Sequence, residues 1–220
     1  MDINKLCSYV DHTELSVIAK KEDIIALCND AKKYGTASVC VAPCHVKTAF
    51  DCLKGDIKVC TVIGFPNGYS TTAVKCFETE DAIKNGADEI DMVINIGLLK
   101  DGRFDEVKDE IAKVKKSCGS KLLKVIIETC LLTNEEIAHM CRIVHEAGAE
   151  YIKTSTGFSK SGATPEDVRI MAENRPDGLK IKAAGGIASL EDAENYIAMG
   201  ADRLGTSRII KIVKSLEETK

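Results

Sequence analysis

The sequence lacks any apolar run that approaches the roughly 20 residues of a membrane span, which excludes a membrane-spanning protein. It also lacks an excess of positive charge. The 30 Lys+Arg and 34 Asp+Glu give a formal net charge of −4, so the broad positive field of a general nucleic-acid-binding protein is missing. The first residues, Met1 to Lys5, contain neither the basic segment nor the long apolar stretch of a secretory signal. We therefore expect a cytoplasmic protein with no membrane and no nucleic-acid partner.

Aromatic residues are scarce, at 5% of 220 residues, and tryptophan is absent, but hydrophobic residues reach 45%. Disordered chains combine low hydrophobicity with high net charge, and this chain has neither property. A chain of this length buries most of its apolar surface in one core, so it needs no disulfide or metal for stability. We expect a single domain over residues 1–220.

Ten cysteines are spread along the chain, most of them within apolar segments. Disulfide frameworks are typical of short secreted domains, and this chain does not look like one. The nearest approach to a metal motif is Cys40-x3-Cys44-His45, which lacks a second pair to complete four ligands. We interpret the thiols as free, buried small hydrophobes and expect no metal and no other cofactor.

A Gly-Ala-acid tripeptide occurs three times, each time between a helix-like stretch and an apolar strand-like run. The copies begin at Gly86, Gly148 and Gly200, and Tyr34–Ala37 is a looser copy. Glycine at this place supplies the left-handed residue that ends a helix. The intervals of 62 and 52 residues each hold two strand–helix units, so one unit takes about 26–31 residues, as a βα module does.

Runs of β-branched residues predict eight strands that alternate with helices. The strands are expected at Tyr9–Thr13, Ala37–Ala42, Lys58–Gly64, Glu89–Ile94, Leu122–Ile127, Tyr151–Thr154, Leu179–Ala183 and Arg203–Gly205. Capping residues predict helix starts at Thr133, Thr164 and Ser189, and a short helix over Ile3–Ser8 is expected to cover the bottom of the fold. Eight near-equal units without a strong Gly-x-Gly-x-x-Gly motif after the first strand favour a closed (β/α)8 TIM barrel over a doubly wound open sheet.

Catalytic groups of such barrels lie at the carboxyl ends of the strands, and two lysines at such positions are candidate catalytic residues. Lys153 and Lys182 occur late in adjacent strands, and neighbouring strands lie about 4.8 Å apart. Two ammonium groups in a partly dry pocket disfavour each other's charge, and a neutral lysine attacks carbonyls to form an imine. The non-catalytic alternative is that one or both lysines lie on the rim of the barrel and are solvated. Other polar residues at strand ends are Asp11, Thr13, Cys40, Asp91, Asn95 and Glu128.

Asp91 lies in the middle of an apolar strand. Alternation places Glu89, Asp91 and Val93 on one face, and the opposite apolar face must pack under helices, so Asp91 is expected to point inward. A buried carboxylate is costly unless it is paired, and the two lysines would provide that pairing. Its role is then proton transfer through water or, alternatively, a purely structural ion pair.

Glycine-rich segments follow the last three strands: Ser155–Gly157, Gly185–Gly186 and Gly205–Ser207. Their exposed N–H groups, together with the start of the last helix, predict an anion site, and phosphate binding after strands seven and eight recurs in barrels.

Several motifs together resemble the deoxyribose-phosphate aldolase family, in order and over essentially the whole chain. They are Asp11-His12-Thr13, Asp88-Glu89-Ile90-Asp91-Met92-Val93, Lys153-Thr154-Ser155-Thr156-Gly157-Phe158, Lys182-Ala183-Ala184-Gly185-Gly186 and Leu204-Gly205-Thr206-Ser207. The resemblance implies a metal-free class I aldolase, a carbon–carbon lyase. It would cleave 2-deoxy-D-ribose 5-phosphate reversibly to acetaldehyde and D-glyceraldehyde 3-phosphate in deoxyribose phosphate catabolism.

The resemblance also implies residue roles. Lys153 would form the imine, Lys182 would favour its neutral form, and Asp91 would move protons through a bound water. Asp11 and Thr13 would help to hold substrate hydroxyls. The phosphate pocket would be lined by Gly157, Gly185, Gly186, Gly205 and Ser207. The partners expected are the phosphorylated sugar and the aldehydes, with a homodimer as the oligomeric form that the resemblance suggests.

Two positions depart from the family pattern. Arg208 stands where many relatives carry a second serine, and it either adds a charge-assisted phosphate contact or points outward. Phe158 stands where some relatives carry lysine, which leaves more of the phosphate contact to backbone amides. The competing hypotheses are another phosphate-binding barrel such as an isomerase, a non-catalytic sugar-phosphate-binding barrel, and a metalloenzyme. Both lysines and Asp91 speak against the first two. His45, His139 and His145 lie away from strand ends, which speaks against the third.

Overall fold

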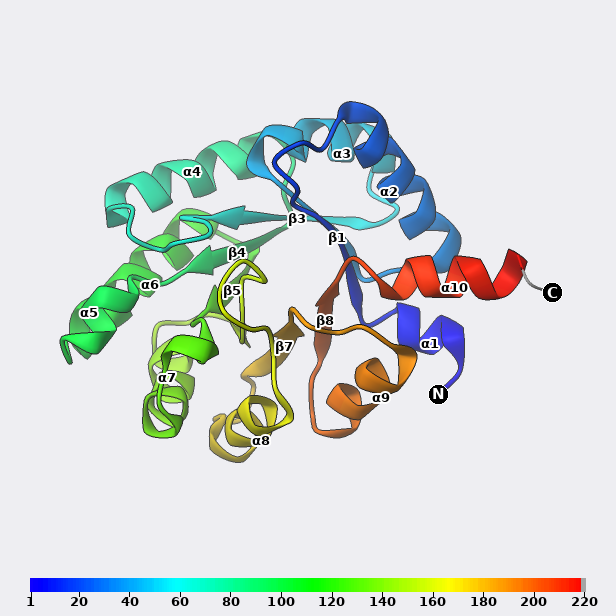
Figure 1. Ribbon diagram of the computed structural model, residues 1–220. Coiled ribbons are helices and arrows are strands. Elements are labelled where there is room, and N and C mark those ends of the chain that lie inside the picture. The colour runs from blue at the N-terminus through cyan, green and yellow to red at the C-terminus, as the bar shows by residue number, and fades with distance from the viewer. Residues whose placement is uncertain (219–220) are drawn as a thin grey trace.

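The computed structural model describes residues 1–218 and shows a closed barrel of eight parallel strands in the order β1 to β8. Helices surround the strands on the outside, and the first and last helices lie on the same side of the barrel (Figure 1). The strands are β1 (Val10–Glu14), β2 (Ser38–Val41), β3 (Lys58–Ile63), β4 (Glu89–Val93), β5 (Leu122–Ile126), β6 (Tyr151–Lys153), β7 (Lys180–Ala184) and β8 (Arg203–Thr206). The predicted TIM barrel is confirmed, with every strand within two residues of its predicted bounds.

Each strand is followed by a helical connection. The helices are α1 (Ile3–Cys7), α2 (Lys21–Tyr34), α3 (Val46–Leu53), α4 (Thr72–Lys84), α5 (Ile96–Lys100), α6 (Phe104–Cys118), α7 (Asn134–Glu146), α8 (Pro165–Asn174), α9 (Leu190–Ala198) and α10 (Ile209–Glu218), with short 3-10 helices η1 (Pro43–His45) and η2 (Thr129–Leu131). The sequence reading did not anticipate α5, whose first turn is capped by the Asn95 side chain. Within residues 1–218, no helix has the length and apolar character needed to cross a bilayer.

The predicted helix starts are confirmed in atomic detail. Thr133, Thr164 and Ser189 each accept a hydrogen bond from the backbone N–H three residues on, and the acidic side chain at that third position accepts one in return from the capping residue's own N–H. These reciprocal bonds satisfy N–H groups that a helix end would otherwise leave unpaired. They set where α7, α8 and α9 leave the loops that surround the carboxyl ends of the strands.

The Gly-Ala-acid repeat fastens neighbouring strands at the end of the barrel where they begin. Asp88 donates its N–H to Val59 O at 2.7 Å, and its carboxylate accepts from Val59 N at 3.2 Å. Glu150 makes the same two hydrogen bonds with the backbone of Leu123, and Asp202 makes them with the backbone of Ile181. The looser copy has no acid and keeps a backbone bond alone, from Ala37 N to Val10 O. The repeat therefore joins β3 to β4, β5 to β6 and β7 to β8.

The two faces of the strands have opposite character. Outward-facing Val39, Ile90, Leu123 and Ile152 are fully buried against the helices in the main apolar core. The inward-facing residues that alternate with them carry many of the charges of the interior. This pattern confirms that Asp91 and Glu89 face the inside of the barrel.

Candidate active site

The two predicted lysines meet inside the barrel around one carboxylate. Lys153 and Lys182 are partners in the register of β6 and β7. The Nζ atoms of Lys153 and Lys182 lie 2.8 and 2.7 Å from the same oxygen, Oδ2 of Asp91 on β4. All three side chains are buried, with Lys153 the most accessible at 3%. The structure thus brings together the three residues that strand position and alternation singled out.

A second layer of charges lies next to this triad. Lys182 Nζ is also 2.5 Å from Oδ2 of Asp11, whose other oxygen accepts hydrogen bonds from Ser38 Oγ and an Arg203 guanidinium nitrogen. Lys124 Nζ lies 3.0 Å from Asp91 Oδ1. It also lies 2.6 Å from Glu89 Oε2. The interior is therefore a continuous network of ion pairs rather than one isolated pair.

The network fixes the charge state of most of its members. Burial opposes the charge of Lys182, but the carboxylates of Asp11 and Asp91 outweigh it and raise the pKa of Lys182 above its ordinary value. Burial likewise opposes ionisation of Asp91, but Lys124, Lys153 and Lys182 hold its pKa well below the usual range. The pKa of Lys124 is raised well above its ordinary value, because Asp91 and its other acidic neighbours outweigh its burial. The expectation that two neighbouring lysines lower each other's pKa is thus wrong for Lys182, since it contacts two carboxylates.

The formal charges of this network do not cancel. Its carboxylates are those of Asp11, Glu89 and Asp91, and its cations are those of Lys124, Lys153, Lys182 and Arg203. Four positive charges against three negative charges leave one cation uncompensated. Desolvation is least tolerable for an uncompensated charge. Of these four cations, Lys153 is the one that lines a cavity in the part of the chain the structure describes.

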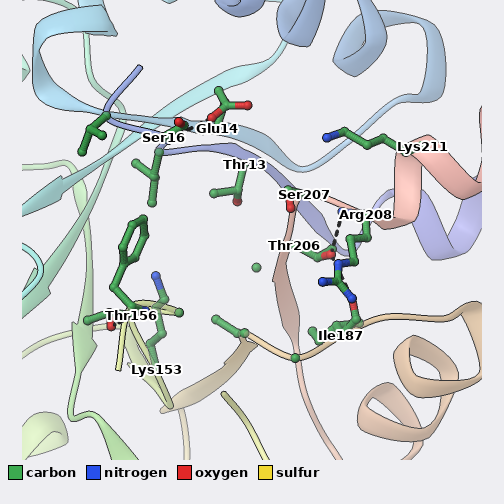
Figure 2. A pocket seen from close by; sticks show the side chains of 18 residues that line it. Thr13, Glu14, Ser16, Lys153, Thr156, Ile187, Thr206, Ser207, Arg208 and Lys211 are labelled. Atoms are coloured by element: carbon green, nitrogen blue, oxygen red, sulfur yellow. Dashed lines mark hydrogen bonds between the residues drawn. The ribbon is translucent and has the colours of Figure 1, made fainter. Parts of the chain in front are cut away.

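That cavity has a volume of about 540 Å³ and opens at the carboxyl ends of β1, β6, β7 and β8. Figure 2 shows Lys153 and Thr156 on one side of it and Thr206, Ser207 and Arg208 on the other. Seven predicted site residues line it: Thr13, Lys153, Gly157, Gly185, Gly186, Gly205 and Ser207.

Asp11, Asp91 and Lys182 lie beneath the cavity rather than in it, and all three are fully buried. For Asp91 and Lys182 this agrees with roles exerted through Lys153. For Asp11 it is a correction, because a residue that holds substrate hydroxyls must reach the cavity. Asp11 instead uses its carboxylate on Lys182, Arg203 and Ser38, which makes it a positioning residue for Lys182.

The glycine-rich loops come close enough for backbone to pack on backbone. Gly185 has φ +77°, and a Cβ added there would lie 2.9 Å from the Cα of Gly162 in the loop after β6. A side chain at position 185 is thus excluded both by conformation and by space. The loops after β6 and β7 therefore approach each other through their backbones at the edge of the cavity.

Sequence reasoning missed two contributors to the site. Lys124 interrupts the apolar run of β5, and the alternation argument used for Asp91 would have placed it inside the barrel as well. Glu128 was noted at a strand end without a role. It is buried with φ +54°, and its carboxylate accepts hydrogen bonds from the N–H and hydroxyl groups of Thr156. Thr156 Oγ1 in turn accepts from Phe158 N, so Glu128 holds the loop that follows Lys153.

Two groups of potential metal ligands occur in the described chain, Cys40–Cys60–Asp91 and Asp11–Cys60–Glu89. Their carboxylates already contact Lys124, Lys153, Lys182 and Arg203, so a metal cation there would face strong positive charge. All ten cysteines are free, as interpreted, and six of them are buried: Cys7, Cys28, Cys40, Cys60, Cys118 and Cys141. Cys44 is exposed, in contrast to the interpretation as buried thiols.

Known proteins are similar to this chain in both sequence and fold. The family model described as DeoC/LacD family aldolase matches residues 5–206. The chain belongs to this aldolase family. A relative from Streptococcus pyogenes serotype M4, named deoxyribose-phosphate aldolase, is 57% identical over 220 residues, which cover 100% of this chain and 98% of the relative.

Solved structures of aldolases superimpose on the whole barrel. An aldolase designated QR15 has a TM-score of 0.92 at 39% identity, covering 97% of this chain and 96% of that one. The deoxyribose phosphate aldolase of Aeropyrum pernix, described as a unique tetramer, has a TM-score of 0.88 at 31% identity, covering 100% of this chain and 94% of that one. Membership of the aldolase family thus rests on sequence and fold over nearly the full length.

Proposed function

We propose that this chain is a class I, metal-free aldolase that cleaves 2-deoxy-D-ribose 5-phosphate reversibly to acetaldehyde and D-glyceraldehyde 3-phosphate. The observation that carries the proposal is Lys153, a cavity-lining amine bound to a buried Asp91–Lys182 pair. The name of the Streptococcus pyogenes relative supports the choice of substrate. We also propose that the chain acts in the cytoplasm, in the breakdown of deoxyribose phosphates.

The chemistry begins at the amine of Lys153. Its neutral form attacks C1 of the open-chain sugar phosphate, and loss of water from the carbinolamine gives an iminium ion. Removal of the proton from the C3 hydroxyl lets the C2–C3 bond break. The electron pair of that bond forms an enamine, and C3 leaves as the aldehyde of glyceraldehyde 3-phosphate. Protonation of the enamine at C2 and hydrolysis by water release acetaldehyde and return Lys153.

Asp91 and Lys182 serve the proton transfers. Asp91 Oδ2 contacts both amines, so a proton released by Lys153 has an acceptor at 2.8 Å and a second exchange partner at 2.7 Å. We assign the proton of the C3 hydroxyl to this pair, through a water molecule beside Lys153. Asp11 keeps the Lys182 ammonium in place from the other side.

The phosphate is assigned to the opposite end of the cavity. Gly157, Gly185, Gly186 and Ser207 line this end, together with Lys211 in the first turn of α10. Backbone donors and a helix start favour an anion. Because Lys153 and these loops line the same cavity, one substrate can place its aldehyde at Lys153 and its phosphate at the loops.

Borohydride trapping tests the proposal. Reduction in the presence of acetaldehyde is expected to add one ethyl group, which peptide mass spectrometry localises to Lys153. Lys153→Ala should form no such adduct and should lose cleavage of 2-deoxyribose 5-phosphate. Lys180→Ala, an exposed lysine on the same sheet, is the matched control and should behave as the wild type. Adducts scattered over surface lysines would instead point to an isomerase or a binding protein, and full cleavage activity of Lys153→Ala would refute the imine mechanism at Lys153.

A further inference from the structure

The cavity carries two more cations at the end away from Lys153. Arg208 and Lys211 line it, and both are exposed. Figure 2 shows the Lys211 side chain extending from α10 toward the cavity, and the Arg208 guanidinium near the same rim. Glu14 is the acid that lines this cavity in the described chain, and its carboxylate accepts a hydrogen bond from Ser16 N.

The backbone around Arg208 is held in place by its neighbours. Thr206 Oγ1 donates to Ile187 O at 3.3 Å and accepts from Arg208 N at 3.1 Å, which ties the loops after β7 and β8 together. Arg208 O accepts from Ile212 N at 3.0 Å, so Arg208 stands at the first turn of α10. Its side chain therefore starts beside the unpaired N–H groups of the helix, where the helix dipole also favours an anion.

The opposite wall of the cavity carries no comparable charge. Position 158, in the loop after β6, is occupied by phenylalanine, which packs edge-on against Phe65 with ring centroids 5.3 Å apart. Lys160, the next cation of that loop, is not among the residues that line the cavity. The positive charge for an anionic substrate thus lies on the α10 side alone, apart from Lys153 itself.

Neither Arg208 nor Lys211 has an ion-pair partner among residues 1–218, in contrast to the saturated network beneath the cavity. Arg208 presents a planar fork of donors that matches two phosphate oxygens, and Lys211 adds a mobile point charge one turn further along the helix. Backbone amides alone bind an anion without distinguishing well between one and two charges. A pair of cations favours a dianion.

We propose that Arg208 and Lys211 are the specificity-determining residues that select a phosphate monoester dianion over a neutral sugar at this active site. The inference rests on the proposed function, which places the aldehyde end of the substrate at Lys153. The positive charge that binds the phosphate then comes from Arg208 and Lys211 on the α10 side, because the loop after β6 carries the uncharged Phe158. Free inorganic phosphate binds at the same place and competes with the sugar phosphate.

Two readouts test this assignment. The first compares kcat/KM for 2-deoxyribose 5-phosphate and for unphosphorylated 2-deoxyribose in Arg208→Ala, Lys211→Ala and the double variant. Loss of each charge-assisted contact is expected to lower kcat/KM for the phosphorylated sugar by about 10-fold, through KM, and kcat/KM for 2-deoxyribose by less than about 2-fold. Arg208→Lys keeps the charge without the fork and should recover part of the loss. Arg142→Ala and Lys116→Ala, exposed cations on α7 and α6, are the matched controls and should change neither value.

The second readout is the dissociation constant of inorganic phosphate, measured by calorimetry in the absence of any aldehyde. The double variant should bind phosphate about 100-fold more weakly than the wild type. Equal phosphate affinity, or an unchanged preference for the phosphorylated sugar, would overturn the assignment. Failure of the proposed function looks different: the wild type would cleave neither sugar, while phosphate binding would still respond to Arg208 and Lys211.

Discussion

The ammonium groups of Lys153 and Lys182 lie against one oxygen, Oδ2 of Asp91, at 2.8 and 2.7 Å. One lysine faces the cavity, and the other is sealed beneath it with Asp11 on its far side. Lys182 contacts two carboxylates, those of Asp11 and Asp91, whereas Lys153 contacts Asp91 alone. The same geometry therefore provides a nucleophile and a fixed cation next to it.

Removing Lys182 tests this division of charge. In Lys182→Met, Asp91 keeps Lys153 as its partner, so the ammonium form of the nucleophile is favoured and kcat should fall at least about 100-fold. The pH profile of the rate at which borohydride traps the adduct should shift to higher pH. A variant that loses activity with an unchanged pH profile would assign Lys182 a purely structural role.

Lys124 is expected to matter for stability more than any surface lysine. Lys124→Met leaves Asp91 and Glu89 buried with one cation fewer, and breaking a buried pair in this way costs about 3–5 kcal/mol. Lys121→Met, which breaks the half-exposed pair with Asp88, should cost no more than about 1 kcal/mol. Urea unfolding curves of the two variants check the difference, and similar losses would contradict the buried-network interpretation.

The absence of a side chain at Gly205 leaves the room that the end of the Lys182 side chain occupies. A Cβ at residue 205 would lie 2.9 Å from Ala184 Cβ and 3.0 Å from Lys182 Cε. Gly205→Ala should therefore displace the end of Lys182 and lower kcat by about 10-fold, as steady-state assays would show. Gly178→Ala, at φ +91° with open space around it, should cost about 1–2 kcal/mol of stability and leave kcat unchanged.

His12 predicts a specific acid sensitivity. It is buried on the outward face of β1, and this burial lowers its pKa to about 4 despite the attraction of Asp30. The unfolded chain takes up a proton near the ordinary histidine pKa, whereas the folded chain does not until about pH 4. The free energy of unfolding should therefore fall as pH drops from about 6.5 to 4, by up to about 3 kcal/mol for this residue. His12→Gln should flatten the pH dependence of unfolding over that interval; an unchanged slope would show that other groups cause it.

The strands and the catalytic triad could be predicted from the sequence because both follow from local patterns. Alternation put Asp91 inside the barrel, and equivalent places in adjacent strands put Lys153 beside Lys182. Depth along the barrel axis could not be predicted in the same way. Asp11 and Thr13 share a face of β1 but differ by about 6.6 Å of rise, so Thr13 reaches the cavity and Asp11 does not.

Contacts across the barrel were also beyond the sequence. Lys124 on β5 and Arg203 on β8 meet the carboxylates of β1 and β4, because closure of the sheet brings together strands far apart in the chain. Local periodicity gives the face of each residue but not its partner across the interior. The raised pKa of Lys182 depends on such a partner, Asp11, and for this reason the sequence argument gave the wrong direction.

The hydrogen bonds of the Gly-Ala-acid repeat join the strands in pairs, and these pairs differ in the sign of the buried charges that they point into the barrel. Every carboxylate of the buried network, Asp11, Glu89 and Asp91, comes from the first four strands. Every cation, Lys124, Lys153, Lys182 and Arg203, comes from the last four. Each half of the chain is therefore left with unbalanced buried charge until it meets the other, and the reactive amine arises where the two halves join.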